Sequence, residues 1–286
     1  MKRATTTEEQ INTLEERGMS ITNKKHVTDV LLSVGYYRMG FYWFPFEECQ
    51  NLNAKRIHKF KPDTTWEKAE ALYNFDDRFR NLLSFYLQAI ETDIRTYLTY
   101  TVSNFYKYDP VWFANPQMVN AKFLAKLDEI YGAVAQNEVI KRHRNFHHND
   151  IYAPAWKTIE FFTFGDVLML YKGIRDEHLQ KAIAGRYDIR NIKVFISYAD
   201  TLRKARNVCA HSHILYDINL STSIRPGLLK MGEKERSNIS GVLKVAYYLL
   251  SKIDKHKEQE LRSAIKQLVE NPSYDKVRTL LADVIY

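Results

Sequence analysis

Apolar residues recur along most of this chain with the period of an α-helix. The clearest case runs over residues 66–105, where no glycine or proline interrupts the pattern. It predicts one helix about 60 Å long at 1.5 Å per residue. Another strong helix is predicted over residues 189–211, and further helices over residues 24–34 and 116–137. Nothing in the pattern requires a β-strand, so the sequence predicts an all-α fold.

Local signals place the ends of several of these helices. Thr6 and Glu9 have the spacing of a capping box, and Gly18 stands where the helix that they open would end. Asn115 followed by Pro116 is typical of a helix start, with asparagine as the cap and proline at the first position.

Two segments are predicted to be irregular. Residues 35–46 read GYYRMGFYWFPF, a dense aromatic segment that ends near a proline, and residues 142–154 are polar. Between and after these regions the pattern predicts short helices over residues 155–162, 166–173 and 176–185. Two or three further helices are expected to close the chain.

The composition agrees with a helical protein. The 286 residues include only 10 glycines and 7 prolines, and scarce helix breakers favour long helices over short strands. Hydrophobic residues make up 45% of the chain, which is typical of a globular protein with a sizeable core. We expect a helical domain over residues 62–286, preceded by a helical extension over residues 1–61 that contains the aromatic segment.

The number of cysteines and the length of the apolar runs indicate in which cellular compartment the protein is expected. Cys49 and Cys209 are too few for a disulfide framework or a four-cysteine zinc site. The first ten residues lack the apolar stretch of a signal peptide, and no apolar run approaches the roughly 20 residues that span a membrane. The sequence therefore predicts a cytoplasmic protein with no membrane partner. Its net charge of +8 favours polyanionic partners, nucleic acid first.

The predicted helix over residues 189–211 carries an unusual set of polar side chains. Its apolar positions follow the helical period: Ile192, Phe195, Ile196, Ala199, Leu202 and Cys209. At about 100° per residue, Arg206 falls inside this stripe and Arg203 lies on its edge. Asn207 and His211 are four residues apart and share a face beside Arg206. Because a buried charge is costly unless it is paired or lines a cleft, we expect one of these two situations here.

A purely structural interpretation of the same residues stays open. Arg206 would then pair with a buried carboxylate such as Glu160 or Glu91, and His211 would only cap the helix C-terminus, where a cation is favoured. The spacing of one arginine and one histidine is also a weak signal by itself, because chance matches are expected in a chain with nine histidines.

A second arginine–histidine pair lies in the polar segment, where Arg142 and Arg144 precede His147 and His148. The simplest interpretation is a basic surface loop with no helix to position its side chains. A metal site of His147, His148 and Asp150 is an alternative, although adjacent histidines point apart and no second pair of ligands is evident.

The end of the strong helix and the residues after it read LRKARNVCAHSHILYD, residues 202–217. This stretch resembles the signature of the Abi-like (abortive infection) proteins, a branch of the HEPN superfamily. Other segments resemble the same family in the same order. They are EEQINTLEERGMSI of residues 8–21, VGYYRMGFYWFPF of residues 34–46, LYNFDDRFRNLL of residues 72–83, IETDIR of residues 90–95 and PAWKTIEFFTFGDV of residues 154–167.

This resemblance implies a HEPN-type helical bundle and metal-independent endoribonuclease activity, as in phage-defence, abortive-infection and toxin–antitoxin systems. It implies that Arg206, Asn207 and His211 are catalytic, with no cofactor. It also implies that two copies of the motif meet across a dimer interface. One departure is local: family members often carry His-His-x-Arg where this chain has HSHI, residues 211–214. The first histidine is retained, the second has moved one place and the basic residue is lost.

The chemistry of RNA fits these residue types. RNA carries its own nucleophile, the 2′-hydroxyl, which must lose a proton while the leaving 5′-oxygen gains one. Histidine is suited to proton transfer near neutral pH, so His211 is the expected acid or base. Arg206 offers a cationic fork to the phosphate, Asn207 orients His211 or donates to the phosphate, and Arg203 holds a neighbouring phosphate. The expected products are a 2′,3′-cyclic phosphate and a 5′-hydroxyl.

Three functions stay open. The first is an RNA-cleaving defence protein that an antitoxin or another inhibitor keeps inactive. The second is a non-catalytic protein that binds a structured or cognate small RNA, with Arg203, Arg142 and Arg144 among its phosphate contacts. The third is a protein-interaction module whose arginines are structural.

Two further expectations concern assembly and the aromatic segment. One motif supplies one histidine, whereas the reaction is helped by both an acid and a base. We therefore expect a homodimer in which the two helices over residues 189–211 lie side by side. The aromatic segment either stacks on unpaired bases or forms a hydrophobic plug that fastens the N-terminal helices.

Overall fold

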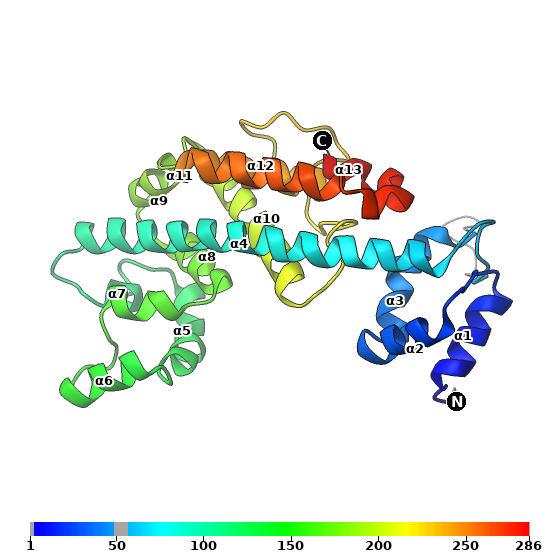
Figure 1. Cartoon of the computed structure of the whole chain (residues 1–286). Coiled ribbons are helices and arrows are strands. Elements are labelled where there is room, and N and C mark those ends of the chain that lie inside the picture. The colour runs from blue at the N-terminus through cyan, green and yellow to red at the C-terminus, as the bar shows by residue number, and fades with distance from the viewer. Residues whose placement is uncertain (1–2, 49–56, 286) are drawn as a thin grey trace. The chain divides into compact units, whose positions relative to one another are not determined.

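The structure, a computed structural model that describes residues 3–48 and 57–285, is dominated by one long helix (Figure 1). This helix, α4, spans Trp66–Phe105, and its bounds confirm those predicted from the sequence. Its buried stripe recurs every three or four residues, as at Leu83, Leu87, Ile90 and Ile94. A continuous stripe without a helix breaker explains why the helix runs through 40 residues.

The chain divides into two compact units, and α4 contributes to both. One unit comprises Met1–Arg80 and Ile265–Tyr286, and the other comprises Asn81–Ala264. The described residues contain thirteen α-helices and no β-strand, so the all-α class is confirmed. The expected HEPN-type bundle and the expected boundary between residues 61 and 62 stay predictions.

The first unit gathers the N-terminal helices around one hydrophobic core. Its further elements are α1 (Thr7–Glu16), α2 (Lys24–Ser33), α3 (Tyr36–Trp43), the 3₁₀ helices Phe44–Phe46 and Pro272–Leu281, and α13 (Ala282–Ile285). The predicted capping box of Thr6 and Glu9 is present. Gly18 ends α1 with φ +96°, and Met19 N–H donates to the Leu14 carbonyl at 3.0 Å. This is the Schellman arrangement, so the predicted helix end is confirmed.

The aromatic segment is helical, so the prediction of an irregular segment was wrong. It forms α3, which starts after Gly35 (φ +95°) and buries Met39, Tyr42 and Trp43 on one face. The aromatic rings carry enough buried area to hold a helix that local propensity does not favour. Tyr37 on the other face is 83% exposed. The segment is therefore core on one side and surface on the other.

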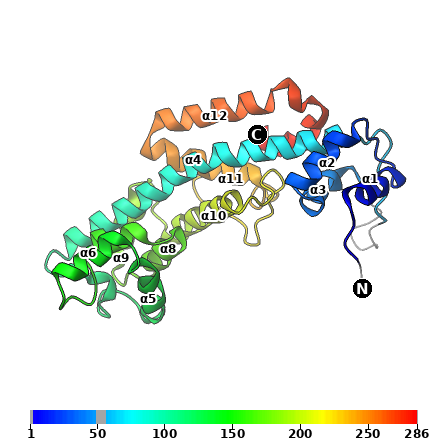
Figure 2. The same cartoon turned by 60° about the horizontal axis from the view of Figure 1, so that its bottom comes forward.

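The second unit contains the helix that the sequence singled out. Its further elements are the 3₁₀ helices Trp112–Ala114 and Ile159–Phe161, α5 (Ala121–Val134), α6 (Glu138–Phe146), α7 (Ala155–Thr158), α8 (Phe164–Gly173), α9 (Glu177–Gly185), α10 (Ile192–Ala210), α11 (Ile239–Ile253) and the first part of α12 (Lys255–Val269). Helix α10 contacts α8, α9 and α11, which makes it the central helix of this unit (Figures 1 and 2). Among the described helices, none combines the length and apolar character needed to cross a membrane.

One local prediction in this unit was wrong, and another holds only for residues 147–154. Asn115 does not start a long helix: its carbonyl accepts from Val119 N–H in a single turn, and Val119 then bridges Ile174. Helix α5 starts later, capped by Asn120. The polar segment is also partly helical, because α6 buries Ile140 and His143 three residues apart on one face.

Residues 211–238 join α10 to α11 without regular structure, yet they pack closely. A Cβ on Gly227 would lie 2.6 Å from Cγ1 of Val194 and 2.9 Å from the Tyr198 hydroxyl. Gly241, in the first turn of α11, is more confined still, because a Cβ there would lie 1.9 Å from the Glu235 carbonyl oxygen. At both positions the approach of neighbouring atoms requires glycine.

Candidate active site

Helix α10 positions the predicted catalytic residues near its C-terminal end. The helix starts at Asn191, whose side chain accepts hydrogen bonds from the N–H groups of Lys193 and Val194. Its buried face is Val194, Phe195, Tyr198, Ala199, Thr201, Leu202, Ala205 and Cys209. This face fixes the rotation of α10 in the unit, and Arg203, Arg206 and Asn207 lie beside it, half-buried.

Arg206 is less buried than its place in the predicted apolar stripe implied. Its side chain is 40% exposed, and its Nε lies 3.3 Å from Oε2 of Glu91 on α4. The expected ion pair is therefore confirmed, with Glu91 as the acid; Glu160, the other candidate, is exposed. In the described part of the chain Arg206 donates no hydrogen bond, so its N–H groups remain available to a ligand.

Glu91 is shared by two arginines. It is only 5% exposed, and its Oε1 accepts a hydrogen bond of 2.6 Å from Nη2 of Arg95, one helical turn further along α4. The same Nη2 donates to the Phe162 carbonyl at 3.1 Å. Oε2 of Glu91 has no hydrogen-bond donor among the described residues. One buried carboxylate thus holds two guanidinium groups, which leaves a local excess of positive charge.

Arg203 is bound by an acid on its own helix. Its Nε and Nη2 lie 3.0 Å and 2.9 Å from Oδ1 of Asp200, and Lys204 Nζ lies 3.3 Å from Oδ2. Burial raises the pKa of Asp200, but the Arg203 hydrogen bond and the two positive charges outweigh this effect and hold the pKa below its ordinary value. The aliphatic part of Arg203 also lies close to Gly165, at the start of α8.

His211 ends α10 and is exposed. Its N–H donates to the Asn207 carbonyl at 3.0 Å, and the chain then turns through Ser212, which has φ +53°. His213 N–H donates back to the Val208 carbonyl at 2.9 Å, which completes a Schellman motif with serine at the position that usually holds glycine. This turn brings the rings of His211 and His213 to a centroid distance of 6.0 Å.

The sequence prediction included neither Arg95 nor His213 in the site. Arg95 stands four residues after Glu91 on a helix, a spacing that signals an ion pair. His213 stands one place from the second histidine of the family pattern, and its approach to His211 depends on a turn through Ser212 that no glycine marks in the sequence. The structure brings together Arg95, Glu91 and Arg206, and separately the two histidine rings.

Arg142 and Arg144 do not belong to this cluster. Both are exposed on α6, which lies apart from α10 in both views (Figures 1 and 2). Between them His143 is buried; burial, aided by the charges of His147 and Lys157, lowers its pKa. Asp150 contacts Nε2 of His143 at 3.2 Å. No group of three metal-ligating side chains occurs among the described residues, which argues against the alternative metal site of His147, His148 and Asp150.

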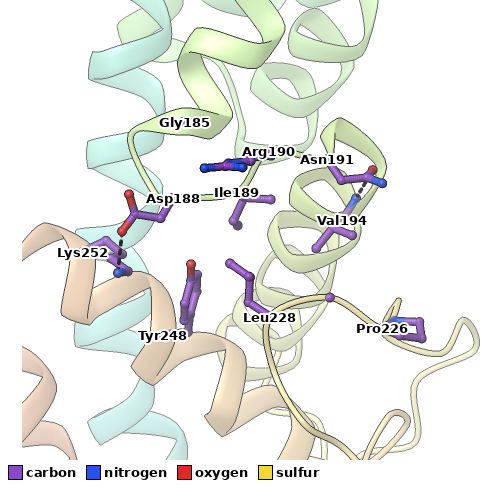
Figure 3. A pocket seen from close by; sticks show the side chains of 11 residues that line it. Gly185, Asp188, Ile189, Arg190, Asn191, Val194, Pro226, Leu228, Tyr248 and Lys252 are labelled. Atoms are coloured by element: carbon purple, nitrogen blue, oxygen red, sulfur yellow. Dashed lines mark hydrogen bonds and ion pairs between the residues drawn. The ribbon is translucent and has the colours of Figure 1, made fainter.

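A cavity of about 940 Å³ lies at the opposite end of α10 (Figure 3). Its walls are mainly apolar, with Ile189, Val194 and Leu228 facing the interior, and an ion pair of 2.6 Å joins Lys252 to Asp188 at its edge. The 19 residues of α10 separate its two ends by about 28 Å. The cavity is therefore distinct from the cluster at the C-terminal end.

The segments that carry the cluster lie within the region of the chain that matches a protein family. A family described as Abi-like protein matches residues 29–217, a region that contains Glu91, Arg95, Arg206 and both histidines of the turn. Neither the curated proteins nor the solved structures contain a match to the chain. Since the family match extends over more than half of the sequence, the chain belongs to the Abi-like protein family.

Proposed function

We propose that this Abi-like protein is a metal-independent endoribonuclease of the HEPN type that acts in abortive infection or a related toxin–antitoxin system. One arrangement carries the proposal. Arg206, held by Glu91, has N–H groups available, and five residues later the exposed His211 lies 6.0 Å from His213, measured between ring centroids. Cleavage through the 2′-hydroxyl needs a cation for the phosphate and imidazoles for the two proton transfers, and the C-terminal end of α10 with the turn after it carries both kinds of group.

In this proposal each step of the cleavage reaction is assigned to a side chain. A neutral imidazole accepts the proton of the 2′-hydroxyl as that oxygen attacks phosphorus. A protonated imidazole donates to the 5′-oxygen as the bond from phosphorus to that oxygen breaks. Arg206 stabilises the extra negative charge of the phosphorane, Asn207 orients the phosphate or His211, and Arg203 contacts a neighbouring phosphate. Because such an enzyme would damage its own cell, we propose that an antitoxin or another inhibitor restrains it.

The product ends test this proposal. We expect the purified protein to cleave single-stranded RNA to a 2′,3′-cyclic phosphate and a 5′-hydroxyl, at a rate that EDTA does not change. Mass spectrometry of a short defined RNA identifies both ends. Inhibition by EDTA that a divalent ion reverses, or a 5′-phosphate on the product, would contradict the mechanism. RNA that binds and stays intact would favour the non-catalytic RNA-binding function instead.

We also propose a homodimer in which two α10 helices lie side by side and each supplies one histidine to a composite site. Co-expression of two differently tagged chains allows dimers with one His211→Ala subunit to be isolated. A composite site predicts that these mixed dimers lose most of the wild-type activity. If they instead keep half of it, and His213→Ala abolishes cleavage, each chain uses its own histidine pair and the composite site is wrong.

A further inference from the structure

A groove of about 470 Å³ runs along the C-terminal part of α4, apart from the histidines. One side of the groove is a face of this helix that includes Thr99, Tyr100 and Ser103, and Lys107 follows the helix end. The other side is formed by Trp156 of α7 and by Glu160 of the 3₁₀ helix after it. The volume lies in the range of small-ligand sites.

Two aromatic rings of this groove are exposed to solvent. Trp156 is 55% exposed and Tyr100 is 64% exposed, whereas Trp43, Trp66 and Trp112 are at most 2% exposed. Among the described residues, the side chains of Tyr100, Lys107, Trp156 and Glu160 form no hydrogen bond or ion pair. Two rings, a cation and a carboxylate therefore share one groove, and none of the described side chains forms a hydrogen bond or ion pair with them.

The charged groups in its lining distinguish this groove from the centre of a protein-docking surface. The centre of a protein interface is depleted of charged groups, whereas this groove holds Lys107 and Glu160 as well as hydroxyl groups. Rings that lie beside hydroxyls and a lysine are the usual elements of single-stranded RNA sites. The net charge of +8 favours the same partner.

The groove and the arginine cluster are built on neighbouring residues of the same two segments. Thr99 stands one helical turn after Arg95 on α4. Glu160 is followed two residues later by Phe162, whose carbonyl accepts the hydrogen bond from Arg95. The groove therefore lies within one helical turn of α4 from the residue that shares Glu91 with Arg206.

We propose that the groove binds one unpaired nucleotide of the RNA and prefers guanine, an inference that rests on the proposed function for the identity of the polymer. The base stacks on Trp156 and Tyr100, and Lys107 contacts a backbone phosphate. Glu160 would repel a phosphate, so it faces the edge of the base. Guanine alone presents two adjacent donors there, N1–H and the N2 amino group, which a carboxylate accepts in parallel. Adenine, cytosine and uracil each place an acceptor beside their donor.

Fluorescence anisotropy of labelled RNA tests this proposal in the full-length His211→Ala variant, which keeps the RNA intact. The probes are four seven-nucleotide oligouridines whose central base is G, A, C or U. We expect the G probe to bind about tenfold more tightly than the others. Trp156→Leu should weaken binding of all four probes about tenfold, because one stacked base is lost. Glu160→Gln should abolish the preference for G and leave the U probe unchanged.

Two matched variants control for exposure and charge. Phe85→Leu changes another exposed ring of α4, about 22 Å from Tyr100 along the helix, and Glu138→Gln changes an exposed acid of α6. Neither should alter binding. Unchanged binding in Trp156→Leu, or a preference for G that survives Glu160→Gln, would overturn the proposal. Cleavage by the wild-type protein is measured separately. If cleavage is absent while the groove variants behave as expected, the endoribonuclease proposal is wrong, whereas the proposal of a nucleotide-binding groove is supported.

Discussion

Replacing His211 by alanine is expected to lower the rate of RNA cleavage by about 10²–10⁴-fold, the usual loss when a general acid or base is removed. The midpoint of thermal unfolding should stay nearly unchanged. His211 is exposed and follows the last residue of α10, and the hydrogen bond from its N–H to Asn207 belongs to the backbone. The substitution therefore removes an imidazole without opening a cavity or unpairing a buried group.

The measurement is a single-turnover cleavage assay beside a thermal melt of the same preparation. His178→Ala is a matched control, because His178 is also exposed, on α9, and lies outside the cluster. That control should cleave as the wild type does. A folded His211→Ala protein with wild-type turnover would refute the assignment of His211.

The second large effect concerns stability. Glu91→Ala is expected to lower the free energy of unfolding by on the order of 3 kcal/mol, because it leaves a buried guanidinium without its counter-charge. The side chain of Arg95 is 13% exposed, and Glu91 is its ion-pair partner among the described residues. Arg206 would lose its partner as well, so cleavage should fall together with stability.

Urea denaturation of a pair of variants separates the two arginines. Arg206→Ala should cost less than about 1 kcal/mol, because this side chain is 40% exposed and Arg95 still neutralises Glu91. Arg206→Lys should keep the stability but not the cleavage, since a point charge does not replace the guanidinium fork. Equal losses of stability in Glu91→Ala and Arg206→Ala would show that the contact with Arg95 contributes little.

The elements that the sequence predicted well are those whose burial repeats over many turns. The bounds of α4 were predicted because 40 residues share one uninterrupted stripe, and α10 was found within three residues at each end. The failures are short segments. Helix α3 has eight residues, and its formation depends on burying Met39, Tyr42 and Trp43 against the first unit, which local propensity cannot indicate.

The candidate site divides in the same way. Arg206, Asn207 and His211 could be proposed as candidates from the sequence because they follow one another closely at the end of one predicted helix. The exposure of Arg206 could not be predicted from the sequence, because the buried face of α10 depends on which helices surround it. The sequence offered Glu91 and Glu160 as acids that could pair with Arg206. The choice between them depends on a contact between residues far apart in the sequence. Arg95 is part of the candidate site only because it donates a hydrogen bond to Glu91.

The close packing of residues 211–238 limits how this region can change in evolution. Loops without regular structure usually tolerate insertions and exchange readily between related proteins. Here Gly227 and Gly241 leave no room for one additional methyl group, although residues 228–238 between them form no helix. We therefore expect related proteins to keep glycine at these two positions and to vary in length and sequence at the exposed positions of the segment.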